Sequence, residues 1–415
     1  MSIEVLAVGD ELLMGTTQDT NSGFVARELF ALGLTLGRVT VVGDAAPAIS
    51  DALGEALARA QAVVVTGGLG PTVDDRTKEV AAAYFGDPLE LDAGILADIR
   101  ARFARRGRPM PEINVKQAMM PRGARTIPNP VGSAPGVHFS RDGRDVFLLP
   151  GVPAEMRAMF RDTVLPYLQS VLAPAPGCFA AFRTVGVPES EVAERIAPVM
   201  EQHPDAEWAF YPGSGGVDVK VRRTGAGDAR WEALRGTLRA TLGPACYSEK
   251  AGETLAEVVQ QALVARRMTL AVAESCTGGL VGARFTAAAG ASACFIGGFV
   301  TYANEAKQRW IDVPEAVLRD HGAVSAPCAA AMARGARVRA ASDIAVAVTG
   351  IAGPGGGTPE KPVGLVYLAL AAVDGCWTRH LQLFADRELN RQVASQLALD
   401  LVRRHLDGLP VGDSA

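Results

Sequence analysis

The sequence predicts an α/β protein in three parts: a doubly wound N-terminal domain, a small α+β middle domain and a second α/β domain at the C-terminus. Two observations carry this prediction. Short apolar runs such as Ile3–Val8 and Ile344–Val348 are typical of parallel strands buried on both faces, and they alternate with longer helical patterns in both halves. Between the halves, the pattern changes to strands that flank a glycine-rich turn.

Length, charge and cysteine usage narrow the class of protein. The 415 residues suffice for several domains of about 100–200 residues each, and we expect them at 1–171, 177–249 and 253–410, with the proline-rich stretch 172–177 as a linker. The net charge of -4, without a basic block, argues against direct nucleic-acid binding. No signal peptide or membrane-length apolar run is recognisable, and the six cysteines have no CxxC spacing. We therefore expect a reduced, cytoplasmic protein without membrane association.

The N-terminal half alternates strands with helices. The expected strands are Ile3–Val8, Thr35–Val42, Ala62–Val65 and Asp145–Leu149, and the expected helices are Gly23–Leu32 and Ala48–Ala60. Three strands run into loops that combine glycine with acidic residues: GDELLMG (9–15), TGGLGPTVDD (66–75) and LPGVPAE (149–155). Ligands of doubly wound sheets bind at the carboxyl ends of the strands, where these loops lie.

These three loops suit a phosphate and a metal. Their backbone N–H groups can bind phosphate oxygens, and neighbouring carboxylates suit Mg²⁺, so metal-assisted cleavage of a pyrophosphate is the expected chemistry. The candidate substrate-binding residues here are Gly67, Gly68, Gly70, Thr72 and Gly151. The alternatives are ordinary turn chemistry for the glycines and helix capping for Asp74 and Asp75.

The middle segment reads as a small α+β domain. The expected strands are Cys178–Val187, Trp208–Tyr211 and Val217–Arg223. One expected helix ends at Met200, and the other spans Trp231–Leu242. Two adjacent arginines on the last strand do not make a nucleic-acid groove, and no GxxG clamp stands between helices. A spacer or a dimer contact is the expected role.

The last domain begins at Thr254, whose spacing to Glu257 predicts a capping box. The expected helices are Leu255–Ala265, Pro327–Ala340 and Asp386–Arg404, and the expected strands are Thr269–Ala273, Phe299–Tyr302, Ile344–Val348, Val363–Val373 and Arg379–Phe384. The tail after Leu406 is expected to be disordered.

A candidate nucleophile lies in AESCTGG (273–279), where a strand, a sharp polar turn and a helix start meet. This geometry places a hydroxyl among converging backbone N–H groups, as acyl transfer requires. The chain has six lysines against thirty-five arginines, and Lys307 follows a predicted strand. A buried lysine can deprotonate and act as a base, whereas arginine cannot. Cys276 is the rival nucleophile, but no histidine is placed to activate it, and packing under the turn is the commoner role.

Four motifs in order, AESCTGG, GGFVTYANEAK, HGAVS and VTGIAGPGGG with KPVG, resemble the C-terminal domain of the CinA family over roughly residues 253–407. The resemblance implies a nicotinamide-nucleotide amidohydrolase (NMN deamidase) without a cofactor, in which Ser275 is the nucleophile, Lys307 the base and Tyr302 a positioning or proton-relay group. The substrate-binding candidates are Glu274, Thr277, Gly278, Gly279, Asn304, Thr349, Gly350, Gly353, Arg387 and Arg391.

Several of these candidates have specific expected roles. The two arginines, at i and i+4 on one helix, suit a phosphate, although a solvated helix face explains them equally well. The amides around Thr349–Ala352 are candidates for the oxyanion site. Glu274 either orients ligand hydroxyls or caps its own turn, and Thr277 has a simple alternative role as a helix N-cap.

The rest of the chain also resembles CinA: the N-terminal half is similar to its molybdopterin-binding (MoaB/MogA-like) domain, and the middle to its KH-like module. Some family members hydrolyse ADP-ribose to AMP and ribose 5-phosphate with a divalent metal (Mg, Mn or Co). This makes Asp74 and Asp75 the leading metal candidates, and Glu11 and Glu155 weaker ones. The resemblance implies NMN and ADP-ribose as ligands and a homodimer. The alternatives are a competence- and DNA-damage-associated partner protein that binds nucleotides without turnover, and a molybdopterin-binding protein.

Overall fold

The computed structural model describes residues 2–172, 177–213, 215–225 and 227–414. The chain divides into two compact units, Met1–Gly177 and Cys178–Ala415. The segments predicted as middle and last domains therefore lie together in the second unit. The proline-rich segment 173–176, part of the predicted linker, lies outside the described residues.

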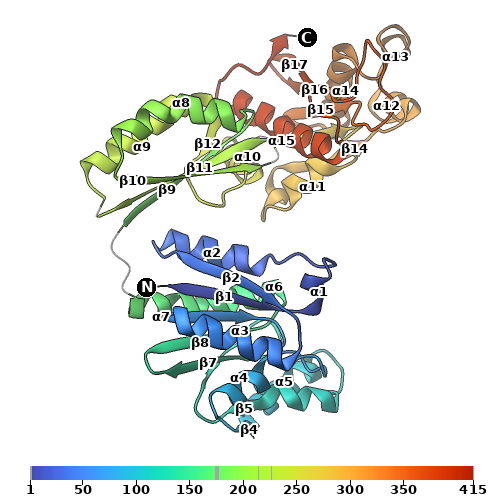
Figure 1. Ribbon diagram of the computed structural model, residues 1–415. Coiled ribbons are helices and arrows are strands. Elements are labelled where there is room, and N and C mark those ends of the chain that lie inside the picture. The colour runs from blue at the N-terminus through green and yellow to red at the C-terminus, as the bar shows by residue number, and fades with distance from the viewer. Residues whose placement is uncertain (1, 173–176, 214, 226, 415) are drawn as a thin grey trace. The chain divides into compact units, whose positions relative to one another are not determined.

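The first unit is built on a six-stranded sheet in the order β2-β1-β3-β8-β7-β6 (Figure 1). Its strands are β1 (Ile3–Val8), β2 (Leu36–Val42), β3 (Ala62–Thr66), β6 (Arg125–Ile127), β7 (Gly136–Arg141) and β8 (Arg144–Leu149). The pairs among β2, β1, β3 and β8 are parallel, and β7 is antiparallel to both of its neighbours. The four parallel strands are those predicted from the sequence.

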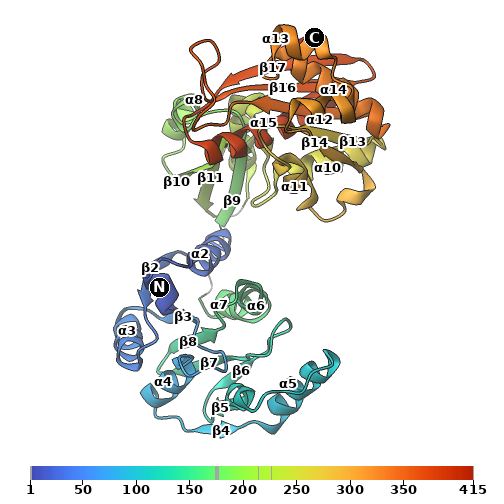
Figure 2. The same cartoon turned by 90° about the vertical axis from the view of Figure 1, so that its right-hand side faces the viewer.

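Helices cover both faces of this sheet, as Figure 2 shows. They are α1 (Asp10–Leu13), α2 (Asn21–Ala31), α3 (Ala46–Arg59), α4 (Thr77–Tyr84), α5 (Ala93–Arg105), α6 (Pro153–Met159) and α7 (Leu165–Leu172). One face of the strands packs with α3 and α4, and the other packs with α2, α6 and α7. Because side chains alternate along a strand, Leu6 and Val8 enter the first core while Ile3 and Val5 enter the second. A 3₁₀ helix (Glu112–Ala118) and the β4–β5 pair (Leu89–Leu91, Met119–Pro121) complete the unit.

The second unit begins with a four-stranded sheet in the order β10-β11-β9-β12. Its elements are β9 (Gly177–Thr184), α8 (Glu189–Gln202), β10 (Ala206–Gly213), β11 (Gly216–Thr224), α9 (Ala229–Leu242) and β12 (Cys246–Ser248). Both helices pack on one face of the sheet, where Phe182, Ile196 and Leu234 are buried in one core. This arrangement confirms the predicted small α+β layer.

The remainder of the unit is a sheet in the order β14-β13-β15-β16-β17-β18. Its strands are β13 (Leu270–Glu274), β14 (Phe295–Val300), β15 (Ile344–Gly350), β16 (Leu365–Ala372), β17 (Gly375–Gln382) and β18 (Asp413–Ser414). Its helices are α10 (Leu255–Arg266), α11 (Leu280–Thr286), α12 (Asn304–Ile311), α13 (Glu315–His321), α14 (Ala326–Ala340) and α15 (Arg387–Leu406). β14, β13 and β15 are parallel, and the others are antiparallel to their neighbours.

The two faces of this sheet differ in side-chain size. Large residues such as Val272 and Val346 pack against α10, α11 and α15. The alternate positions are alanines, among them Ala273 and Ala347, and they pack against the alanine-rich α14. Small side chains on both α14 and the sheet let the two approach closely. The alternation of small and large residues along the strands therefore sets how far the helices on each face lie from the sheet.

The tail contradicts its prediction. Beyond Leu406 the chain is ordered: Val411 is buried in the main core, and Asp413 pairs with Thr378 as β18 joins the sheet edge. The prediction of disorder was wrong because it rested on the glycines and prolines of the tail alone. The exposed edge of β17 offers the tail backbone hydrogen-bond partners, and the tail's own sequence does not reveal that edge.

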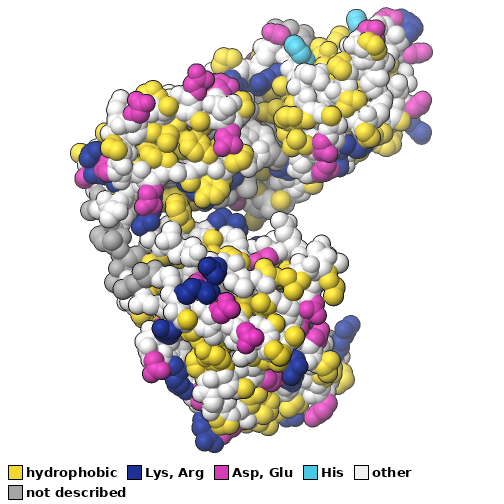
Figure 3. All heavy atoms as spheres, viewed as in Figure 1, with side chains coloured by type: hydrophobic (Ala, Val, Ile, Leu, Met, Phe, Trp, Pro, Cys, Tyr) yellow, Lys and Arg dark blue, Asp and Glu magenta, His cyan; other side chains and the backbone are white. Residues whose placement is uncertain are grey.

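The distribution of charge on the surface is mixed. On the face drawn in Figure 3, basic and acidic side chains are interspersed, which is the pattern of a solvated surface. In the described part of the chain, no helix is both long and apolar enough to cross a membrane.

Candidate functional site

The turn after β13 is held in place by Glu274. Its buried carboxylate accepts hydrogen bonds from the backbone N–H groups of Gly279 (3.0 Å), Val281 (3.0 Å) and Gly282 (2.9 Å) at the start of α11. Gly278 and Gly279 have φ values of 63° and 98°, which glycine adopts without strain. The sequence left two roles open for Glu274, orienting a ligand and capping its own turn. The contacts of Glu274 show capping, because its carboxylate is engaged by backbone N–H groups.

Ser275 and Lys307 meet, although they are far apart in sequence. Lys307 Nζ lies 3.1 Å from Ser275 Oγ and also donates to the carbonyls of Thr301 (2.8 Å) and Tyr302 (3.1 Å). Lys307 is 1% exposed and Ser275 9% exposed. Burial lowers the pKa of Lys307, because desolvation disfavours the ammonium form. A serine hydroxyl in contact with a buried amine of lowered pKa is the arrangement of a nucleophile and its base.

The sheet register explains why these two residues meet. β13 and β14 are parallel neighbours with Glu274 opposite Val300, so the chain leaves both strands at the same edge. Thr301 N–H donates to Glu274 O (2.8 Å) and continues this pairing. α12 then begins at Asn304, which is exposed, and its first turn directs Lys307 inward.

Tyr302, predicted as a positioning or proton-relay group, contacts Lys307 through its backbone. Its carbonyl accepts from Lys307, but its side chain is 61% exposed, and its hydroxyl lies 3.3 Å from Arg387 Nη2. Arg387 Nη1 also donates to Gly353 O (2.6 Å). The tyrosine hydroxyl is thus associated with a guanidinium at the rim rather than with the buried lysine.

The two arginines of α15 lie over the turn. Arg391 Nη2 donates to Thr277 O (3.2 Å), and its Nη1 forms an ion pair with Glu388 (2.7 Å). Among the described residues, no ion pair joins Arg387 to a carboxylate. Arg387 is therefore the better of the two for an anionic group of a ligand.

In the loop after β15, several groups of the predicted oxyanion site already have partners within the protein. Thr349 Oγ1 is buried and donates to Ala323 O (2.8 Å), and Ile351 N–H donates to Leu365 O (2.9 Å). The Ile351 amide is thus committed to the sheet and does not serve an oxyanion. Gly350 pairs with Val366 within the same ladder.

Asn390 was missed by the sequence reasoning. It is buried, and its Nδ2 donates to Ala352 O (2.9 Å) and Phe384 O (2.8 Å), while its Oδ1 accepts from Phe384 N–H (2.8 Å). It fixes the loop after β15 against α15. Its position between the two arginines, one residue before Arg391, is the signal that could have found it.

The other side chains of the turn are buried. Cys276 is 6% exposed, and burial raises the pKa of its thiol to about 12, which makes the thiolate inaccessible at neutral pH. Thr277 is fully buried, and its hydroxyl has no hydrogen-bond partner among the described residues. It does not cap α11, whose N-cap is Gly279. These contacts favour Ser275 as the nucleophile.

The three N-terminal loops enclose a cavity of about 480 Å³. Its lining includes the predicted residues Glu11, Gly67, Gly68, Gly70, Asp74, Asp75, Gly151 and Glu155. A Cβ at Gly67 (φ 107°) would overlap the carbonyl of Val8, so this position requires glycine. Thr72 contacts Asp75 through both its N–H (2.9 Å) and its hydroxyl and thereby shapes the loop.

The acidic residues of this cavity suit a cation completed by a ligand. Asp44, which the sequence reasoning missed, has its pKa raised by burial and further by the charges of Asp10, Glu11 and Asp74. Glu155 accepts from Asn129 Nδ2 (2.6 Å). No three His, Cys, Asp or Glu side chains of the described residues are grouped to hold a metal by themselves. Mg²⁺ is usually bound by one or two carboxylates together with substrate phosphates, and the cavity fits that pattern.

Lys116 braces the same loop, and Lys78 holds the segment that carries Lys116. Lys116 Nζ donates to Thr72 O (2.8 Å) and to Asp75 O. Lys78, buried at the start of α4, donates to the carbonyls of Lys116 (3.0 Å) and Gln117 (3.1 Å), and burial lowers its pKa to about 8. Nothing in the sequence selected Lys116.

Comparisons with known proteins agree with this architecture. Residues 4–170 match the family model "Probable molybdopterin binding domain", residues 181–248 "Damage-inducible protein CinA KH domain" and residues 252–406 "CinA C-terminal domain". CinA-like proteins of Synechococcus sp. (strain RCC307) and Gemmatimonas aurantiaca are each 43% identical and cover 99% and 97% of this chain and 96% of their own length. A solved structure of CinA from Thermoplasma acidophilum is 38% identical, covers 39% of this chain and 95% of its own, and has a TM-score of 0.37. The chain belongs to the CinA family.

Proposed function

We propose that the C-terminal site hydrolyses the carboxamide of NMN to nicotinate mononucleotide and ammonia. The observation that supports it most is the 3.1 Å contact between Ser275 Oγ and the buried amine of Lys307, whose pKa burial lowers. Neutral lysine can accept the serine proton, which an ordinary lysine at neutral pH cannot do. Arg387, at the rim of the same site, is placed for the phosphate of a nucleotide.

The reaction has two halves. Ser275 Oγ attacks the carboxamide carbon while Lys307 Nζ takes its proton, and a C–O bond forms. The tetrahedral intermediate collapses, the C–N bond breaks, and the lysine ammonium returns the proton to the leaving ammonia. Water then attacks the acyl-serine ester with Lys307 again as the base. The lysine ammonium returns this proton to Ser275 Oγ as the C–O bond to Ser275 breaks, and the product leaves as the acid, which ionises to the carboxylate in water.

Ammonia release from NMN tests this proposal directly. We expect the wild type to release ammonia, Ser275→Ala to release none above background, and Cys276→Ala to remain active, because that thiol is buried and protonated. Release that persists in Ser275→Ala would contradict the assignment of the nucleophile. Binding of NMN without turnover by the wild type would favour the partner-protein alternative.

For the N-terminal unit, the proposed activity is metal-dependent hydrolysis of ADP-ribose to AMP and ribose 5-phosphate. Its support is the cavity in which glycine loops lie beside Glu11, Asp74 and Asp75, and in which burial and, further, neighbouring acids raise the pKa of Asp44. A divalent metal bound there would neutralise the pyrophosphate and polarise its phosphorus–oxygen bonds. AMP release that requires Mg²⁺ and is lost in Asp74→Asn is the expected result, and equal release with EDTA present would contradict it. The homodimer stays a prediction.

A further inference from the structure

A second cavity of the Cys178–Ala415 unit belongs to neither proposed site. It has a volume of about 480 Å³ and lies where the KH-like sheet meets the last domain. The KH-like sheet contributes Arg183, Tyr211, Asp218 and Tyr247, and the other wall is formed by the start of α10, the end of α11 and the middle of α15. This size falls within the range of about 300–1,000 Å³ that is usual for small-molecule sites.

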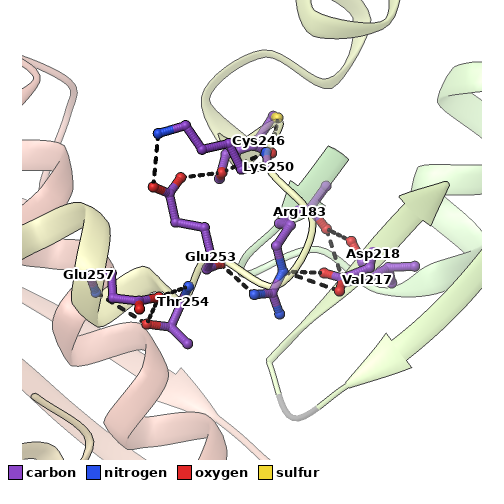
Figure 4. Close-up of polar contacts among 10 residues, drawn as sticks. Arg183, Val217, Asp218, Cys246, Lys250, Glu253, Thr254 and Glu257 are labelled. Atoms are coloured by element: carbon purple, nitrogen blue, oxygen red, sulfur yellow. Dashed lines mark hydrogen bonds and ion pairs between the residues drawn. The ribbon is translucent and has the colours of Figure 1, made fainter. Parts of the chain in front are cut away.

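On the KH-like side of the cavity, the charges of Arg183 and Asp218 balance each other. Arg183 Nε donates to both carboxylate oxygens of Asp218 (3.0 and 3.1 Å), its Nη1 donates to Glu253 O, and its guanidinium lies 5.6 Å from the ring centre of Tyr247. Figure 4 shows Arg183 reaching from the sheet to the segment that precedes α10. The charge of Arg183 is thus satisfied by protein, and the residue joins the two parts rather than awaiting a ligand.

The start of α10 is also satisfied. Glu257 accepts from Thr254 N–H (2.6 Å), and Glu257 N–H donates to Thr254 Oγ1 (3.2 Å), so both members of the capping box are engaged (Figure 4). The second carboxylate that lines the cavity therefore has its own backbone partner. Neither this helix end nor the Arg183 pair calls for an additional ion.

Arg284, on α11, is different. Its Nε donates to Ser395 Oγ (2.6 Å), its Nη1 lies 3.4 Å from Gln396 Oε1, and its Nη2 lies 3.4 Å from Gln392 O and also donates to Gln392 Oε1. All of these acceptors are uncharged, and no ion pair of the described residues joins Arg284 to a carboxylate. Burial lowers the pKa of Arg284, yet arginine stays charged in proteins. Glu388 attracts this charge from a distance but is itself paired with Arg391, so the positive charge on the cavity wall is only partly compensated, which is unfavourable for a half-buried group.

An aromatic surface faces the same cavity. Tyr211 on β10 is 47% exposed although it lines the cavity, and Tyr247 lies deeper beside Arg183. Lys220 Nζ lies 4.1 Å from the ring centre of Tyr211. A cavity lined by aromatic rings and by the Arg284 guanidinium suits a planar ring that carries an anionic group, since stacking and charge-assisted hydrogen bonds act on different parts of such a ligand.

We propose that this cavity binds a phosphate ester with a planar ring, of the nucleoside monophosphate class, with its phosphate on Arg284 and its ring against the tyrosines. The site is distinct from the turn at Ser275, but α11 joins the two, because it begins at the glycines of that turn and ends at the cavity.

Calorimetric titration of the full-length protein tests this inference, with AMP, adenosine and inorganic phosphate as probes. We expect AMP to bind and Arg284→Gln to weaken one AMP-binding event at least about tenfold, the effect of losing a hydrogen bond to a charged group. Arg319→Gln is the matched control, because Arg319 is exposed on α13 and pairs with its neighbour Asp320. AMP that titrates identically in the wild type and Arg284→Gln, or that does not bind, overturns the inference.

A second variant guards against misfolding of the first. Ala287→Trp keeps Arg284 but places a large side chain at the cavity wall, and we expect it to abolish the same event while the thermal unfolding midpoint stays near that of the wild type. Full AMP affinity in Ala287→Trp overturns the location. Adenosine that binds as tightly as AMP overturns the phosphate contact, and phosphate alone binding as tightly overturns the ring contact. Because binding is the readout, failure of the proposed hydrolytic activities is distinguishable from failure of this inference.

Discussion

Replacing Lys307 separates the role of a base from that of a fixed positive charge. Lys307→Met keeps a linear side chain of similar length but removes the amine nitrogen that lies 3.1 Å from Ser275 Oγ. Lys307→Arg keeps the charge and the donors but cannot deprotonate. If the lysine acts as a neutral base, both variants lose activity, whereas a purely electrostatic role would be preserved in the arginine variant.

The expected loss follows from the contacts of the amine. General-base catalysis contributes about 10²–10⁴-fold, which corresponds to about 3–5 kcal/mol in the barrier, so kcat/KM for NMN should fall by that factor in Lys307→Met. The stability effect is smaller. The methionine leaves the carbonyls of Thr301 and Tyr302 without their donor, at about 1–3 kcal/mol each, but it also removes the cost of burying an ammonium group.

The pH profile supplies the second measurement. Because burial lowers the pKa of Lys307, the neutral amine forms below the ordinary lysine value of 10.5. We expect kcat/KM to rise with pH through this lowered pKa and to level off before pH 10.5, as followed by ammonia release at fixed ionic strength. A profile that is flat from pH 6 to 10, or a Lys307→Arg variant with wild-type activity, would refute the reasoning.

Three further predictions concern groups whose environment the structure defines. Glu274→Gln weakens the cap on three backbone amides, so we expect a free energy of unfolding lower by about 1–3 kcal/mol. We also expect a reduced kcat with KM for NMN little changed. A raised KM alone would instead indicate that Glu274 binds the ligand. The pKa of Lys78, about 8 in the folded protein against an ordinary 10.5, means that the unfolded chain binds more protons in this window. The free energy of unfolding, relative to Lys78→Met, should therefore rise by about 3 kcal/mol between pH 8 and 10.5 in denaturant titrations, and parallel pH curves would contradict this. Ala347→Leu places a large side chain in the alanine layer under α14 and should lower the free energy of unfolding by about 1–3 kcal/mol, whereas an unchanged midpoint would show that the layer can expand.

Local patterns were sufficient for much of the fold. The strand runs around Ile3 and Ile344, and the capping box at Thr254, are properties of neighbouring residues, and the structure confirms them. Local patterns failed where a distant element supplies the partner. The tail after Leu406 is ordered because β17 leaves an edge for it, and nothing in the tail itself records that edge.

The candidate site divides along the same line. The sequence by itself marked Ser275 and Lys307, since a polar turn between strand and helix and a rare lysine can both be recognised from the sequence. Only the tertiary structure decided that the two atoms lie 3.1 Å apart, that Glu274 holds the turn and that the hydroxyl of Tyr302 contacts Arg387. It also decided that Asn390 fixes the neighbouring loop. The physical reason is that local propensity and side-chain period depend on near neighbours, whereas burial, a lowered pKa and a hydrogen bond between strand ends depend on which strands pair.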